Sequence, residues 1–106
     1  MSQVALVVQF EIRSGQREAF LAHMRAHAAA TLSEVEGCIQ FDVLVPQEQQ
    51  FDTAERIEDP DHVYLYEVYV DNAALIAHVG SPRVARTRAG YADMVLSRKI
   101  IRCAIG

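Results

Sequence analysis

Apolar and polar side chains alternate along residues 3–12, QVALVVQFEI, which is the pattern of a β-strand. One face of this segment is wholly apolar and holds Val4, Leu6, Val8, Phe10 and Ile12. The other face is apolar over its first half, because Ala5 and Val7 precede Gln9 and Glu11. The pattern therefore predicts a central strand that is covered on both sides.

A helical period follows the turn at Ser14-Gly15. From residue 16 to about residue 34, the buried side is marked at four-residue spacing by Phe20, Met24, Ala28 and Leu32. Gly37 ends this region. Residues 38–45 then predict a second strand, whose apolar face is formed by Ile39, Phe41, Val43 and Val45.

Residues 46–61, PQEQQFDTAERIEDPD, interrupt the alternation and carry six acidic residues against one arginine. Pro46 and Pro60 bracket the segment, and Thr53 to Ile57 are compatible with one helical turn. Loops of this length are uncommon in compact domains. The segment is either a lid or partner surface, or a solvated acidic excursion.

The stretch from His62 to Val79 combines a strand with a helix. β-Branched and aromatic residues favour a strand over 62–70, and Asp71 is placed to cap the helix that follows. Glu67 shares its strand face with Val63, Leu65 and Tyr69, while His78 follows Leu75 and Ala74 by about one turn. A carboxylate in such company must be paired, hydrogen-bonded or facing a cavity. We therefore expect a site between this strand and this helix.

The remaining chain predicts a helix that restarts at Ser81-Pro82 and runs to about Tyr91, then a last strand from Met94 to Ile105. The order β-α-β-β-α-β is that of a ferredoxin-like α+β domain, with an antiparallel sheet and helices on one face only. We expect one such domain over residues 1–106. Because the first and third strands are apolar on both faces, the uncovered sheet face is expected to pack against a second copy in a homodimer.

Composition and charge exclude some classes of partner and location but do not indicate an activity. Hydrophobic residues make up 51% and charged residues 23% of the chain, and the net charge is −4, which disfavours nucleic acid as a partner. No apolar run is long enough for a membrane span or a secretory signal, so a cytoplasmic protein is expected. Cys38 and Cys103 lie in strands at opposite sheet edges and are expected to be free thiols.

Two runs, EGCIQFDVLV (36–45) and YLYEVYVDNAALIAHVGSP (64–82), resemble the antibiotic biosynthesis monooxygenase (ABM) family. The residues that match its pattern in place are Gly37, Cys38, Asp42, Val43, Tyr66, Glu67, His78, Ser81 and Pro82. The resemblance implies a dimeric α+β barrel and a monooxygenase that works without a cofactor. This sequence departs from the family pattern in three places: Glu36 replaces a proline, Arg83 replaces a second histidine, and the 46–61 loop is longer than usual.

Glu67 and His78 are the best catalytic candidates. In the functional interpretation His78 exchanges a proton with a phenolic or enolic substrate, while Glu67 orients it or holds its charge. In the structural alternative a buried Glu–His or Glu–Tyr hydrogen bond only locks the helix to the strand. Tyr64, Tyr66, Tyr69 and Phe41 are candidates for an aromatic substrate pocket, or for core packing.

Basic side chains offer further candidates. His23 and His27 lie four residues apart, a metal-binding spacing, but no third ligand is suggested, so His27 is expected at a cavity edge and no metal is predicted. Arg83, with Arg86 and Arg88, could hold an anionic substrate group or form a solvated face or dimer contact.

Three functions remain open from the sequence. They are a monooxygenase of a small quinol or polyphenol-like substrate that uses dioxygen, an isomerase or other proton-transfer enzyme with the same pocket, and a non-catalytic dimeric small-molecule-binding module. No phosphate cradle, nucleophile elbow, or flavin or nicotinamide fingerprint is present, so no cofactor is predicted. The absence of tryptophan disfavours the haem-degrading branch of the resembled superfamily.

Overall fold

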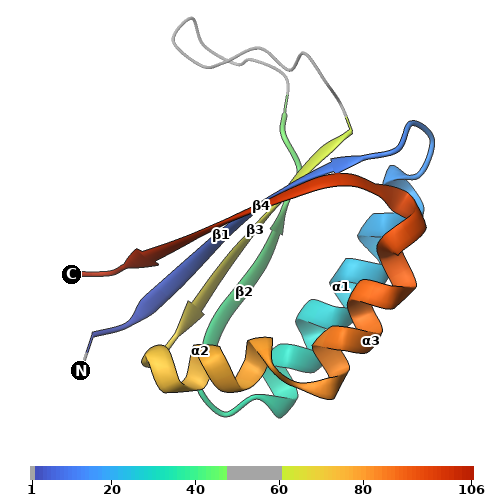
Figure 1. The fold of residues 1–106 in the computed structure, drawn as a ribbon. Helices are drawn as coiled ribbons and strands as arrows, with labels where there is room; N and C mark the ends of the chain where they lie inside the picture. The colour runs from blue at the N-terminus through green and yellow to red at the C-terminus, as the bar shows by residue number, and fades with distance from the viewer. Residues whose placement is uncertain (1, 48–60) are drawn as a thin grey trace, which may run out of the picture.

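The computed structural model describes residues 2–47 and 61–106. Its elements follow the predicted order (Figure 1). They are β1 (Val4–Ile12), α1 (Arg17–Glu34), β2 (Cys38–Leu44), β3 (His62–Tyr69), α2 (Asn72–Val79), α3 (Pro82–Tyr91), the short 3-10 turn η1 (Ala92–Met94) and β4 (Val95–Ala104). The predicted loop over 46–61, with its helical turn at 53–57, lies outside the described residues except at its two ends.

The strands form one antiparallel sheet in the order β2-β3-β1-β4, with the helices on one face (Figure 1). This topology confirms the ferredoxin-like α+β fold. β1 lies inside the sheet and pairs along its length with both β3 and β4. β2 and β4 form the two edges, and Cys38 and Cys103, one on each, are free as predicted.

Two details of the predicted faces are wrong, each for a geometric reason. An α-helix advances 100° per residue, so a strict four-residue spacing drifts by about 40° per step. Leu32 has therefore turned out to 45% exposure, and Thr31 takes the buried position instead. In β2 a register shift between Cys38 and Gln40 inserts one extra residue, which leaves Ile39 exposed while Cys38 and Phe41 face the helices.

Side-chain caps define where the last two helices, α2 and α3, begin. Oδ1 of Asp71 accepts a 2.8 Å hydrogen bond from the Ala74 amide, and Oγ of Ser81 accepts one of 3.3 Å from the Val84 amide. Pro82 occupies the first turn of α3. As a result α2 crosses one end of the sheet, while α3 runs beside α1 (Figure 1).

The core lies between the helices and the sheet face that they cover. The rings of Phe10, Phe20 and Tyr91 pack with centroids 4.9 to 5.5 Å apart and join β1, α1 and α3. The opposite sheet face carries no helix among the described residues (Figure 1). No helix in the described ranges is both long enough and apolar enough to cross a membrane.

Candidate functional site

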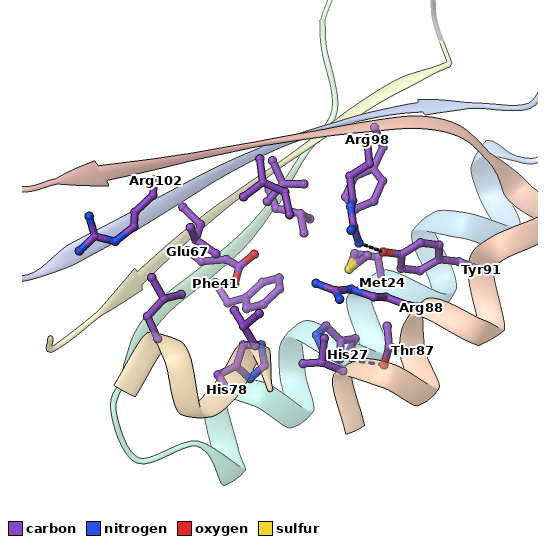
Figure 2. Close-up of a pocket in the computed structure, with 18 of the residues that line it drawn as sticks. Met24, His27, Phe41, Glu67, His78, Thr87, Arg88, Tyr91, Arg98 and Arg102 are labelled. Carbon is purple, nitrogen blue, oxygen red and sulfur yellow. Dashed lines mark hydrogen bonds between the residues drawn. The ribbon is translucent and has the colours of Figure 1, made fainter. Parts of the chain in front are cut away.

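A cavity of about 250 Å³ lies between the covered sheet face and the three helices (Figure 2). Its apolar lining comes from Leu6, Val8, Phe10, Met24, Phe41, Leu65, Leu75, Ile76, Val79, Val84 and Ile100. The most exposed members of this set are Ile76 of α2 and Ile100 of β4. A cavity of about 150 Å³ can already hold benzene, so this one is sized for a substituted ring.

Glu67 projects into the cavity from β3 and is only 5% exposed. Its Oε1 accepts a 2.6 Å hydrogen bond from the hydroxyl of Tyr69, which is fully buried on the same strand face. Burial raises the pKa of Glu67 to about 7, although the Tyr69 hydrogen bond acts in the opposite direction. The carboxyl group can therefore both give and take a proton near neutral pH.

His78 enters the same cavity from α2 and is also 5% exposed. Its ring stacks on Tyr69, with centroids 5.6 Å apart and planes 29° apart. Burial, and then the charges of Arg83 and Arg88, lower the pKa of His78 to about 4. Within the part of the chain that the structure describes, its buried Nδ1 has no hydrogen-bond partner. His78 is thus a neutral imidazole that lines a largely apolar cavity.

The structure brings Glu67 and His78 to one cavity but separates them by Tyr69. The Tyr69 ring lies against His78, and its hydroxyl is bonded to Glu67. Of the two hydrogen bonds weighed from the sequence, the Glu–Tyr bond is the one present. Glu67 therefore keeps its partner when His78 is changed.

His27 of α1 completes the polar lining on the helix side. Its Nδ1 lies 3.0 Å from Oγ1 of Thr87, and its ring meets Phe41 edge-on at 5.6 Å. Burial, then the charge of Arg83, lowers the pKa of His27 to about 4. His23 is instead bonded to the Thr87 carbonyl at 3.1 Å. Across residues 2–47 and 61–106, no three histidine, cysteine or acidic side chains are grouped to hold a metal ion.

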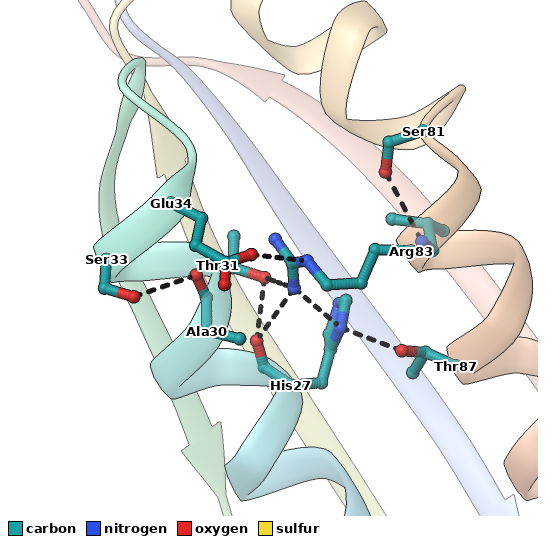
Figure 3. A network of polar contacts seen from close by, with 9 residues as sticks. His27, Ala30, Thr31, Ser33, Glu34, Ser81, Arg83 and Thr87 are labelled. Carbon is teal, nitrogen blue, oxygen red and sulfur yellow. Dashed lines mark hydrogen bonds and ion pairs between the residues drawn. The ribbon is translucent and has the colours of Figure 1, made fainter.

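Arg83 takes a structural position rather than one on the cavity lining (Figure 3). Its Nη1 donates to Oγ1 of Thr31 at 2.9 Å and to the His27 carbonyl at 3.4 Å, and its Nε lies 3.3 Å from Oε2 of Glu34. These contacts tie α3 to α1 and fix the backbone that carries His27. Arg83, a candidate substrate contact from the sequence, therefore lies outside the cavity lining.

The four aromatic candidates separate by strand face. Phe41 lines the cavity, and Tyr69 lies fully buried beneath His78 without lining it. Tyr64 and Tyr66 project from the opposite sheet face, because side chains alternate along a strand. Their predicted place in the cavity is not seen.

The sequence interpretation named Arg88 as a candidate for an anionic group, but it missed three further residues that line the cavity. Arg88 and Tyr91 of α3 and Arg98 of β4 line one end of it, whereas Arg102 of β4 lines the end near Glu67, because both pair with Leu6 of β1 (Figure 2). Nη1 of Arg98 donates to the Tyr91 hydroxyl at 3.1 Å. Arg98, Ile100 and Arg102 share a face because β4 pairs with β1, opposite Phe10, Val8 and Leu6. In the sequence, the two-residue spacing of Arg98, Ile100 and Arg102 indicates that they share one face of a strand. It does not indicate whether the helices cover that face.

Comparisons with known proteins agree with the fold. The family model described as antibiotic biosynthesis monooxygenase (ABM) matches residues 3–90. A Caulobacter crescentus protein, provisionally assigned as an antibiotic biosynthesis monooxygenase, has a TM-score of 0.85 at 13% identity, over 99% of this chain and 91% of its own.

Two further solved structures show the same likeness. A protein from Shewanella oneidensis has a TM-score of 0.79 at 21% identity, with 98% of this chain and 91% of that chain covered. One from Nitrosomonas europaea, provisionally assigned to the same activity, has a TM-score of 0.78 at 22% identity, covering 97% and 89%. The comparison with curated proteins gave no match. At these identities the structural likeness shows the fold.

Proposed function

The chain belongs to the antibiotic biosynthesis monooxygenase family, and from this premise we propose that it is a cofactor-independent monooxygenase of a small quinol or polyphenol-like substrate. The observation that supports this proposal is the neutral His78 ring, which lines an apolar cavity of ring size and whose buried Nδ1 has no hydrogen-bond partner among the described residues. A monooxygenase-like role holds at the level of the family. The substrate class and the residue roles are our proposal.

In this proposal His78 is the general base. Its ring takes up the proton of a substrate hydroxyl, and an imidazole that is neutral at physiological pH is available for that step. The apolar walls exclude water, so the electron-rich anion that forms is not quenched by solvent before it meets dioxygen. Glu67, with a pKa of about 7, lies across Tyr69 from His78 and can return a proton to the departing oxygen.

The reaction balances without a separate reductant. A ring carbon of the deprotonated quinol forms a bond to dioxygen, and the O–O bond then breaks. One oxygen atom stays on the ring and the other leaves as water, which carries two protons. The quinol supplies all four electrons and is released as a hydroxyquinone. Neither a flavin nor a metal is required for this electron count.

The proposed activity is tested by oxygen uptake with hydroquinones as substrates. Wild-type protein is compared with His78→Phe, which keeps an aromatic ring above Tyr69 but has no base. His62→Gln is the matched control, because His62 does not line the cavity. We expect His78→Phe to lower kcat by about 10²- to 10⁴-fold, with substrate affinity changed only a few-fold.

Two other results would replace this proposal. Exchange of substrate protons with deuterated solvent, without oxygen uptake, would assign the cavity to proton transfer or isomerisation. Tight binding of the hydroquinones with neither exchange nor uptake would assign it to binding alone. A His62→Gln loss as large as that of His78→Phe would remove His78 from the mechanism.

We further propose that the protein works as a homodimer whose subunits meet through the sheet faces that carry no helix. Tyr66, Val7 and Ile101 form a row across β3, β1 and β4 on that face. Ile101 is 59% exposed in one chain, so this row offers apolar surface on a helix-free sheet face that a partner can cover. A second copy offers the same row in a self-complementary, two-fold arrangement.

The two free thiols bear on the compartment. Cys38 is buried and Cys103 is partly exposed, and neither is bridged. Thiols persist in reducing compartments. We therefore propose a cytoplasmic location.

A further inference from the structure

The cavity has two chemically different ends. Glu67 and His78 lie at one end, and the side chains of Arg88 and Arg98 converge from opposite walls at the other, beside Tyr91 (Figure 2). We propose that these two arginines form an anion-binding subsite, so that the preferred substrate is an aromatic quinol bearing a carboxylate group. The quinol part of this statement rests on the proposed function, whereas the anionic part rests on the charges described below.

The cavity is cationic although the protein is acidic. Three arginines line it, at positions 88, 98 and 102, against Glu67 as its one carboxyl group among the described residues. The whole chain has a net charge of −4. A cleft of one sign with apolar walls concentrates the opposite charge. An anionic ligand is therefore favoured here, against the overall charge of the molecule.

Among the described residues, Arg88 and Arg98 also lack the carboxylate partners that Arg17 and Arg83 have. Arg17 lies near Glu18, and Arg83 is paired with Glu34. By contrast, Arg98 donates to the neutral hydroxyl of Tyr91 at 3.1 Å. Within the described ranges no ion pair neutralises Arg88 or Arg98.

The buried Tyr91 gives this end a fixed geometry. A guanidinium has five N–H donors, and Arg98 spends one of them on the Tyr91 hydroxyl, which orients the group and leaves the others for a ligand. Arg88 reaches the same region from α3 and is half-buried. Two guanidinium groups at one end of a partly enclosed cavity match the two oxygens of a carboxylate.

The two ends together define a pose. A carboxylate held by Arg88 and Arg98 places the attached ring against the apolar side chains of Met24 and Phe41. A hydroxyl on the far side of that ring then points toward Glu67 and His78. Of the three basic residues considered together from the sequence, only Arg88 lines the cavity. Arg83 is bonded to α1, and Arg86 is exposed and outside the cavity lining.

The test compares two probes that differ in one charge. 2,5-Dihydroxyphenylacetate and its methyl ester are titrated into the protein by calorimetry without oxygen, so that no turnover occurs. We expect the acid to bind at least about tenfold more tightly than the ester. Arg88→Gln and Arg98→Gln should each weaken binding of the acid about tenfold, with less than about a twofold change for the ester.

Two further variants sharpen the comparison. Arg86→Gln, on the same helix but outside the cavity, should bind both probes as the wild type does. Arg88→Lys keeps the charge and loses the planar fork, so its affinity for the acid should lie between wild type and Arg88→Gln. Thermal unfolding of each variant shows that it is folded, and the acid's affinity should fall as salt is added.

Equal affinity of wild type for acid and ester overturns the anionic subsite, as does failure of both probes to bind. An Arg86→Gln loss equal to that of Arg88→Gln also overturns it. The oxygen-uptake assay tests the proposed monooxygenase activity independently of these binding measurements. Charge-dependent binding without oxygen uptake supports the subsite and ends the monooxygenase proposal. Oxygen uptake with neutral quinols, without charge-dependent binding, supports the monooxygenase proposal and ends the anionic subsite.

Discussion

The hydroxyl of Tyr69 donates a 2.6 Å hydrogen bond to Oε1 of Glu67, two residues earlier on the same face of β3. Both side chains are buried. Burial, and then the Glu67 carboxylate, raise the pKa of Tyr69, so this hydroxyl remains a donor throughout the physiological range. Glu67 therefore has a permanent partner that does not depend on the ligand or on His78.

Glu67→Gln should change how stability depends on pH. The folded pKa of Glu67 is about 7, above its ordinary 4.5, so its favourable contribution is complete below about pH 4.5 and is lost as pH rises to about 7. His27 and His78 act oppositely, because their pKa values fall from 6.5 to about 4 and stability is lost as pH falls through that range. We expect the glutamine variant to gain stability relative to wild type as pH rises from about 4.5 to 7.

Urea unfolding at several pH values, with equal protein concentration, measures this difference. Glu11→Gln is the control, since Glu11 lies on the other face of the same sheet. A constant stability difference between Glu67→Gln and wild type over this pH range would mean that Glu67 titrates normally.

Arg83 should control the charge state of His27. Its guanidinium contacts the imidazole at 3.3 Å and is, after burial, the largest cause of the low pKa of His27. Arg83→Gln removes that charge, so the His27 pKa should rise from about 4 toward 6.5. Arg83→Lys should keep the pKa low but lose about 1–2 kcal/mol of stability, because a lysine cannot reproduce the contacts to α1.

Imidazole proton resonances followed by NMR against pH give the His27 pKa directly. Arg86→Gln removes the same charge from an exposed position of the same helix, and Arg86 is not among the charges that lower the His27 pKa, so the titration should stay as in wild type. Titration of His27 near 6.5 in the wild type would contradict the burial on which this prediction depends.

Local signals in the sequence were enough for the fold. Asp71 and Ser81 mark the starts of α2 and α3, and the alternation of residues 3–12 identifies the inner strand. The errors lie where a shift of one residue changes which side chains face the core. Thr31 takes the buried position predicted for Leu32, and the register shift near Ile39 turns that side chain outward. Neither event leaves a distinct local pattern.

Only part of the candidate site could be predicted from the sequence. Glu67 and His78 stand out because each is a polar residue in an apolar stretch, and both do line the cavity. Arg98 lies in a strand that also holds Lys99, Arg102 and several apolar residues, so nothing local marks it. Its position beside Tyr91 depends on the pairing of β4 with β1, a long-range contact that a local pattern does not encode.

Gly37 should be intolerant of a side chain. A methyl group there would overlap the Cβ of Ala74, at the point where the turn before β2 meets α2. We expect Gly37→Ala to cost about 1–3 kcal/mol of stability through overpacking. Ala74→Gly alone should cost up to about 1 kcal/mol, and the double variant should lose less than the sum of the two.

Chemical unfolding of the two single variants and the double variant forms the required cycle. Gly80→Ala is the control, since its methyl group would meet the Ile76 carbonyl at an ordinary 3.4 Å. Strict additivity of Gly37→Ala and Ala74→Gly would show that the overlap does not determine the cost.

The proposed dimer makes the last prediction. An obligate pair should bury more than about 1,200 Å² in total, and Ile101 lies on the sheet face that would supply it. Ile101→Glu places a charge in that interface, where its desolvation is unfavourable, so the variant should be monomeric at micromolar concentration. Ile100→Glu makes the same change one residue earlier, on the cavity side of β4, and should remain dimeric. Light scattering after gel filtration measures both masses, and a wild type that elutes as one 11.8 kDa species would refute the dimer.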